Sequence, residues 1–151
     1  LMAYCHVAHD CILGNHIIIA NSTQLAGEVV VDDFAIIGGM SAIHQFCHIG
    51  PHVMISGGSL IGKDIPPYVK AARHPISYAG INSIGLRRRQ YSNEKIQEIQ
   101  DIYRIIYLKG MNNTDAVNFV EAEMPASKER DEIILFIKNS KRGIMKGYFP
   151  E

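Results

Sequence analysis

The sequence lacks tryptophan, has only three cysteines and six prolines among 151 residues, and carries no excess charge of either sign. An odd cysteine count argues against a disulfide framework and favours a reducing cytosol. Fifteen basic residues balance fifteen acidic ones, which argues against a nucleic-acid partner or an anionic membrane surface. No apolar run approaches the roughly 20 residues that cross a bilayer, and we expect no signal peptide. We therefore expect a soluble, cytoplasmic protein without a transmembrane segment.

A repeat of six residues runs through the first 61 positions. Every sixth residue is Leu, Ile or Val: Leu1, Val7, Leu13, Ile19, Leu25, Val31, Ile37, Ile43, Ile49, Ile55 and Ile61. The residue that follows is nearly always small, and we expect it to let the backbone turn. A period of six is typical of a parallel β-helix built from hexapeptides, not of an α-helix or a hairpin. Three hexapeptides close a triangular coil, so residues 18 apart should stack at the strand spacing of about 4.8 Å.

The repeat divides the chain into three predicted parts. Residues 1–66 form the β-helix, residues 67–91 form a connecting loop that opens near the paired prolines of "KDIPPYVKAARHP", and residues 92–151 form a helical domain. Ser92, Thr114 and Ser127 are the expected N-caps of three helices, the first of which ends near Gly110. The apolar faces of these helices are expected to cover the open end of the solenoid. We expect a mostly β protein with a small α-helical cap at its C-terminus.

Stacking at 18-residue intervals gathers polar residues along one edge of the prism. His9 and Gly27 share a column, and Asp10 lies beside His9. A histidine can remove a proton from a hydroxyl near neutral pH, and a neighbouring carboxylate can orient it. The N–H of a glycine in the next coil can stabilise an oxyanion. This combination predicts acyl transfer to an alcohol, although a lone histidine is more often an ordinary polar turn residue.

The spacing of the histidines and of the cysteines can be interpreted in the same register. His44, His48 and His52 have the spacing of a metal-binding helix face, but in hexapeptide register they point in different directions. Cys11 and Cys47 lie two coils apart, about 9.6 Å if stacked at the strand spacing. That distance exceeds disulfide reach, so both are expected to fill small core positions.

The stretches "HVAHDCILGN", "VDDFAIIGGMSAIHQF" and "GLRRR" resemble the acyl-ACP:UDP-N-acetylglucosamine O-acyltransferase family, which opens lipid A biosynthesis in Gram-negative bacteria. The resemblance implies a left-handed β-helix, a homotrimer with grooves between subunits, and no metal or cofactor. The implied substrates are a (R)-3-hydroxyacyl chain on acyl carrier protein and the 3-OH of UDP-N-acetylglucosamine.

The resemblance also implies residue roles. His9 would be the general base, Asp10 would orient it, and the Gly27 amide would form the oxyanion hole. The sugar and acyl-phosphopantetheine groove would be lined by His6, His44 and Gln45. Gly57 would lie where the acyl chain length is measured, and the nucleotide or the carrier protein would be contacted by Asn82, Arg88 and Arg89.

Two positions depart from the family pattern, namely Glu28 where a histidine is common and Ile84 where an acidic residue is common. The family also has further N-terminal coils, so we expect this chain to be the C-terminal portion of a longer protein. Three alternatives stay open. They are another hexapeptide acyltransferase that uses acyl-CoA or an amine acceptor, a zinc-dependent protein of the hexapeptide carbonic anhydrase type, and a structural or assembly role.

Overall fold

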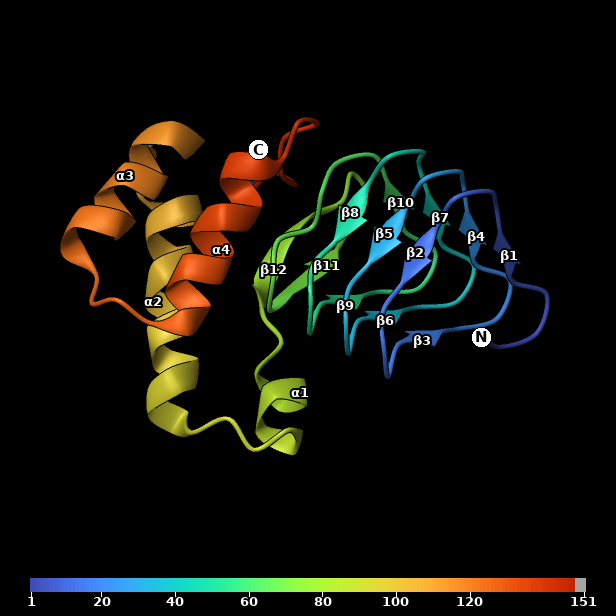
Figure 1. The fold of residues 1–151 in the computed structure, drawn as a ribbon, viewed down its shortest axis with the longest axis horizontal. Helices are drawn as coiled ribbons and strands as arrows, with labels where there is room; N and C mark the ends of the chain where they lie inside the picture. Colours follow the sequence, from blue (N-terminus) through green and yellow to red (C-terminus); the bar gives the residue numbers. More distant parts are fainter. Residues whose placement is uncertain (149–151) are drawn as a thin grey trace.

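The chain forms a triangular parallel β-helix with helices packed at its C-terminal end (Figure 1). The computed structural model describes residues 1–148, so residues 149–151 of the predicted helical domain lie outside it. Ten two-residue strands build the coils: β1 (His6–Val7), β2 (Ile12–Leu13), β3 (Ile18–Ile19), β4 (Gln24–Leu25), β5 (Val30–Val31), β6 (Ile36–Ile37), β7 (Ala42–Ile43), β8 (His48–Ile49), β9 (Met54–Ile55) and β10 (Leu60–Ile61). They form three faces, ordered β1-β4-β7-β10, β2-β5-β8 and β3-β6-β9. The expected left-handed parallel β-helix with a helical cap is confirmed.

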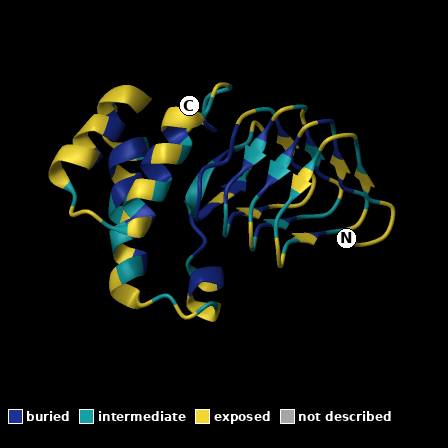
Figure 2. Cartoon of the chain, viewed as in Figure 1, coloured by how far each residue is buried: buried dark blue, intermediate teal, exposed yellow. Residues whose placement is uncertain are grey.

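The register between coils is the predicted 18 residues. His6 pairs with Gln24, Ile12 with Val30, and so on around the prism. The second residue of each strand points inward, and from Ile19 to Ile61 these aliphatic side chains are at most 2% exposed. Burial of such a side chain contributes roughly 1.5–3 kcal/mol, so the repeat that identifies the fold also stabilises it. Figure 2 shows buried and exposed positions following one another along each coil, with exposed residues at most of the corners.

The corners are built differently from the prediction. The backbone turns at the third residue after each aliphatic, where φ lies between 57° and 69° from Tyr4 to His52 although none of these residues is glycine. The small residue directly after the aliphatic has another purpose. A Cβ atom on Gly38 would lie 2.4 Å from the backbone nitrogen of Gly57, so Gly38 must be small because the next coil's backbone lies against it.

The small residues two positions before the aliphatics satisfy backbone carbonyls. Cys5 Sγ donates to Ala20 O (3.0 Å), and Cys11 Sγ donates to Ala26 O (3.2 Å). Thr and Ser hydroxyls occupy the same position in other coils and donate in the same way. All three cysteines are free thiols. Buried carbonyls need a donor, which explains why this position favours small donors.

The segment 67–91, expected to be a connecting loop, contains two strands and a helix. Strand β11 (Val69–Ala72) extends the face of β9 in parallel, with Lys70 opposite Met54. Strand β12 (Ser77–Ile81) then runs antiparallel to β11 and leads to helix α1 (Ser83–Arg88). The pairing of β11 spans 16 residues instead of 18, so a search for an 18-residue period misses it.

Three longer helices complete the chain, namely α2 (Asn93–Leu108), α3 (Asn113–Glu123) and α4 (Lys128–Asn139). Ser92 and Ser127 cap α2 and α4 as predicted, each accepting a backbone N–H three residues later. Thr114 is not a cap: α3 begins earlier, because Asn112 Oδ1 accepts from Asp115 N at 2.8 Å. Helix α2 packs on β12 and buries Tyr103, whose hydroxyl donates to the Pro67 carbonyl at the end of the solenoid.

None of the helices within residues 1–148 is both long enough and apolar enough to span a bilayer.

Candidate active site

His9 and Gly27 meet at the corner between the β1 face and the β2 face. A Cβ atom built on Gly27 would lie 2.5 Å from both Cε1 and Nε2 of His9. The imidazole therefore occupies the space that any larger residue at position 27 would fill. The predicted stacking of these two residues is confirmed.

Asp10 orients the His9 ring. His9 Nδ1 lies 3.0 Å from Asp10 Oδ2, with both side chains largely exposed, at 65% and 76%. An ionised carboxylate can only accept, so Nδ1 carries the proton and Nε2 keeps its lone pair. Asp10 reaches this position from a left-handed backbone conformation (φ 59°), which short polar residues adopt more readily than others. The free basic nitrogen is the one that faces Gly27.

The Gly27 N–H has no acceptor within the described residues, whereas its neighbours do. The Ala26 N–H donates to Ile43 O (3.1 Å) and the Glu28 N–H donates to His9 O (2.9 Å). At the equivalent hexapeptide position of another corner, the Asn15 N–H donates to the carboxylate of Asp33 at 2.7 Å. This amide position of the coil can therefore bind an anionic oxygen, as an oxyanion hole requires.

Glu28 joins the cluster from the coil above Asp10. One ligand atom each from His9, Asp10 and Glu28 lies within 4.8 Å of the other two, and all three residues are exposed. An imidazole and two carboxylates could hold a divalent transition metal ion. His44, His48 and His52, the trio considered from the sequence, contact separate partners instead: the Gln45 carbonyl, the Asp32 carboxylate and the Arg89 guanidinium.

The other sequence-predicted residues fall into three places. His6, His44 and Gln45 lie near the His9 corner, His6 in β1 and the other two one coil beyond Gly27. Gly57 lies at a different corner, where a Cβ atom would lie 3.2 Å from the Gly39 carbonyl. Asn82 and the arginines lie near the third corner, at His52.

Asn82 has a structural role at the junction of α1 and the solenoid. It is buried, its Oδ1 accepts from Gly85 N at 3.3 Å, and its Nδ2 donates to the His52 carbonyl at 3.0 Å. It thus caps α1 and ties that helix to the solenoid. Arg88 is exposed at the end of α1, whereas Arg89 is half-buried beside His52. The sequence signal for this role is an Asn three residues before Gly85, which is typical of an N-cap.

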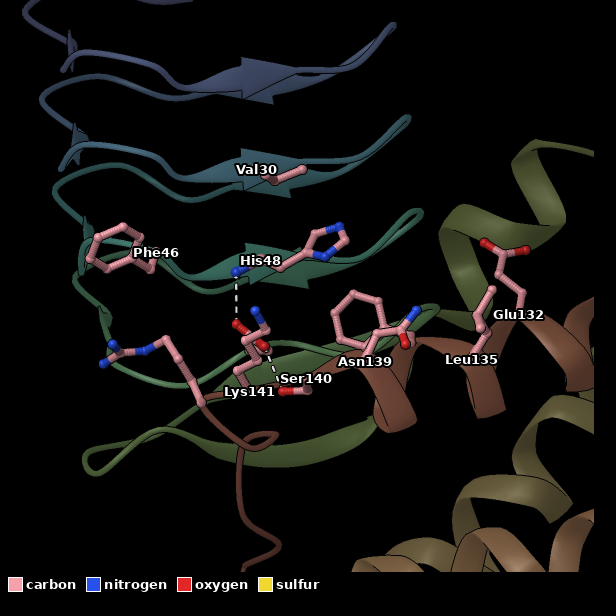
Figure 3. Close-up of a pocket in the computed structure, with 11 residues that line it drawn as sticks. Val30, Phe46, His48, Glu132, Leu135, Asn139, Ser140 and Lys141 are labelled. Carbon is pink, nitrogen blue, oxygen red and sulfur yellow. Dashed lines mark hydrogen bonds between the residues drawn. The ribbon is translucent and has the colours of Figure 1, made fainter.

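A hollow of about 640 Å³ lies elsewhere, between the β5-β8 face and α4 (Figure 3). Its walls include Val30, Leu135 and Phe136, together with polar residues such as Asp64 and Ser140. Asp64 accepts from the His48 backbone N–H (2.8 Å) and from the Ser140 hydroxyl (2.5 Å). The His48 side chain also lines the hollow, and its Nε2 lies 2.7 Å from Asp32 Oδ2. The His48 ring and the Asp64 carboxylate in this hollow are therefore held by other groups of the chain.

A second hollow, of about 590 Å³, is basic. It is lined by Lys63, Arg73, His74 and Lys146 among others, and none of its lining residues within 1–148 is acidic. Lys63 belongs to the His9 column, two coils beyond Gly27. The hollow has the charge to receive an acidic group near the end of that column.

Comparison with known proteins agrees with this geometry. Residues 64–145 match the sequence profile of the second domain of UDP-N-acetylglucosamine O-acyltransferase. Two curated relatives, both named acyl-[acyl-carrier-protein]–UDP-N-acetylglucosamine O-acyltransferase, come from Halorhodospira halophila (45% identical over 146 residues) and Burkholderia lata (41% over 150). In both cases the match covers 97% of this chain and 57% of the relative.

Solved structures give the same result. The UDP-N-acetylglucosamine acyltransferase LpxA of Bacteroides fragilis superposes with a TM-score of 0.95 at 55% identity, over 97% of this chain and 57% of that one. LpxA of Acinetobacter baumannii gives 0.89 at 41% identity, over 94% and 55%. The chain thus spans a little more than half the length of these relatives. It belongs to the UDP-N-acetylglucosamine O-acyltransferase family.

Proposed function

We propose that the protein is a cytoplasmic O-acyltransferase of lipid A biosynthesis. It moves a (R)-3-hydroxyacyl chain from acyl carrier protein to the 3-OH of UDP-N-acetylglucosamine. The observation that carries the proposal is the His9 corner. An imidazole whose Nδ1 lies 3.0 Å from the Asp10 carboxylate lies against Gly27, and the Gly27 N–H has no acceptor among residues 1–148. The relatives' names supply the donor and the acceptor.

The reaction follows from the roles of these groups. His9 Nε2 takes the proton of the sugar 3-OH as its oxygen attacks the thioester carbonyl. The Gly27 N–H donates to the oxyanion that forms, and Asp10 stabilises the imidazolium. When the tetrahedral intermediate collapses, the C–S bond breaks and the proton on His9 passes to the departing thiolate. The proposed reaction requires no metal or cofactor.

The complete site is proposed to form between subunits of a homotrimer. In one chain the His9 corner, the Gly57 corner and the His52 corner are separate edges of the prism. A neighbouring subunit with its own Gly57 and Arg88 edges opposite His9 would complete a groove. The outer face of β3-β6-β9 supports this, because Ile18 and Met54 are exposed there at 43% and 37%. We propose that the acyl chain lies along this face toward Gly57, with His6, His44 and Gln45 contacting the sugar and pantetheine.

The nucleotide and the carrier are assigned by charge. We propose that Arg88 and Arg89 contact the diphosphate, since guanidinium groups bind phosphate oxygens in a bidentate manner. Asn82 holds these arginines through its cap of α1. The basic hollow beside Lys63 suits the acidic carrier protein.

The test uses full-length protein with purified acyl-ACP and UDP-N-acetylglucosamine. His9→Ala should abolish turnover, because the general base is lost, while the far-UV circular dichroism spectrum stays unchanged. His16→Ala, which removes a corner histidine at another edge, is the matched control and should keep turnover near that of the wild type. Near-normal turnover of His9→Ala would remove His9 from the mechanism. A panel with acyl-CoA and with amine acceptors tests the assigned substrates, since preference for either would replace them.

A further inference from the structure

His52 lies where the solenoid meets the segment that carries Asn82 and the arginines. Its backbone carbonyl accepts from Asn82 Nδ2 (3.0 Å). Its ring Nδ1 lies 3.2 Å from Arg89 Nη1, and its Nε2 lies 3.3 Å from the Tyr91 hydroxyl. One residue of the β-helix therefore contacts the start of α1, the arginine at its end and the tyrosine beyond it.

The partners of His52 determine its protonation. A guanidinium can only donate, so Nδ1 must accept from Arg89 and the single ring proton lies on Nε2, which donates to Tyr91. The ring is neutral in this arrangement. Burial, followed by the Arg89 charge, lowers the pKa of His52 to about 4; Lys128 acts in the same direction and Asp33 in the opposite one. The ring therefore stays an acceptor throughout the physiological pH range.

Aromatic stacking holds the same ring in place. His16, Phe34 and His52 occupy one corner column with centroid separations of 5.0 and 5.1 Å, and Tyr68 continues the stack at 5.5 Å. The Arg89 guanidinium carbon lies 5.1 Å from the centroid of the Phe34 ring. The guanidinium thus has an aromatic face and a neutral nitrogen acceptor as neighbours, and these leave its remaining N–H groups for a ligand.

We propose that His52 is a positioning residue of the nucleotide site. It holds Arg89 through its ring and the Asn82 cap through its carbonyl, without touching the substrate itself. This inference rests on the proposed function, because it assumes that Arg89 binds the phosphates of the sugar nucleotide. A neutral acceptor is required here, since a cationic side chain at this position would repel the guanidinium.

Two variants of His52 separate the acceptor function of its ring from its place in the aromatic stack. His52→Phe keeps a ring in the stack but removes the acceptor, and the backbone accommodates it because Phe34 and Phe46 already adopt the same left-handed conformation (φ 62° and 69°). His52→Asn keeps an acceptor near the position of Nδ1. His16→Phe makes the same chemical change in the same column, where no arginine bond is lost.

Steady-state kinetics of the full-length variants then test the proposal. Loss of one charge-assisted hydrogen bond should raise KM for the sugar nucleotide about tenfold in His52→Phe, with kcat changed less than about threefold. His52→Asn should recover most of the lost affinity, and His16→Phe should match the wild type. In the Arg89→Ala background, His52→Phe should add no further effect.

The outcomes separate the two proposals. If Arg89→Ala raises KM but His52→Phe does not, the positioning role is wrong and the proposed function stands. If Arg89→Ala leaves KM unchanged, the proposed nucleotide contact fails, and with it this inference. Equal losses in His52→Phe and His52→Asn, or a parallel fall in kcat and thermal stability, would show a purely structural role. The ¹⁵N chemical shifts of His52 provide a readout independent of activity, because they must show the Nε2–H tautomer at pH 7.

Discussion

Replacement of Gly27 by alanine should separate catalysis from folding in this protein. The new Cβ would lie 2.5 Å from His9 Cε1 and Nε2. Carbon atoms in ordinary contact lie about 3.5–4.0 Å apart, so the imidazole must move by roughly 1 Å. The atoms in the way belong to an exposed side chain and not to the backbone, so the movement costs little folding free energy.

The magnitude follows from that displacement. A shift of about 1 Å in a catalytic group costs on the order of a hundredfold in rate, and the methyl group also crowds the amide that receives the oxyanion. The backbone at Gly27 does not have a positive φ, so alanine fits it without strain. A compatible Gly→Ala change alters stability by less than about 1 kcal/mol, usually upward. We expect kcat to fall about a hundredfold with no loss of thermal stability.

The assay is turnover of acyl-ACP and UDP-N-acetylglucosamine, with a thermal melt of the same samples. Gly62→Ala is the matched control: a Cβ there meets nothing within 4 Å, and Ala8 and Ala26 hold the same place in earlier coils. Gly38→Ala is the opposite control, because its Cβ would strike the Gly57 backbone nitrogen at 2.4 Å. It should cost about 1–3 kcal/mol of stability. Normal kcat in Gly27→Ala would refute the assignment of this corner as the active site.

Three further predictions concern charge and pH. Asp10→Asn should lower kcat about ten- to a hundredfold, a moderate effect for a largely exposed orienting group; an unchanged pH–rate profile would contradict it. Protein treated with a chelator should keep full turnover. Added Zn²⁺ should inhibit turnover by binding His9, Asp10 and Glu28. Glu28→Gln should weaken this Zn²⁺ binding, as measured by calorimetry. Burial lowers the pKa of His52 from 6.5 to about 4. Below pH 6.5 the unfolded chain therefore binds a proton that the folded chain does not, and the free energy of unfolding falls as the pH approaches 4. The loss should be up to about 2 kcal/mol after allowance for partial exposure, and denaturant melts of His52→Phe should show a smaller acid-dependent loss.

The sequence predicts the solenoid and the His9 corner because both depend on the regular spacing of residues along the chain. An aliphatic residue at every sixth position requires three short strands per coil, and the 18-residue register then places His9 on Gly27 without further information. The Asp10 contact follows because it is adjacent in sequence and lies on the same corner. The caps at Ser92 and Ser127 were predictable for a similar reason, since an N-cap depends on neighbours within one turn.

The structural features that the repeat does not predict depend on contacts with other residues. Strand β11 pairs with β9 across 16 residues, and the paired prolines Pro66 and Pro67 just before it look like a break in the chain. The family resemblance implies that Asn82 contacts a ligand, yet its side chain is buried and donates to the carbonyl of His52, thirty residues earlier. Thr114 is a reasonable cap by residue type, but Asn112 competes two positions before it and forms the bond. In each case the partner that decides the local structure is not visible in the local sequence.

The left-handed corners have a consequence for how this scaffold can change. Tyr, Asp, His, Ser, Glu, Phe and Met all occupy the turning position with nearly the same backbone, at a cost of about 1–2 kcal/mol each relative to glycine. Since these turning residues lie outside the packed interior, their side chains can be exchanged one at a time while the frame stays the same. New specificities can therefore arise by single substitutions at these turning positions. At a turning position that contacts no ligand, substitution by glycine or asparagine offers a simple route to a more heat-resistant protein.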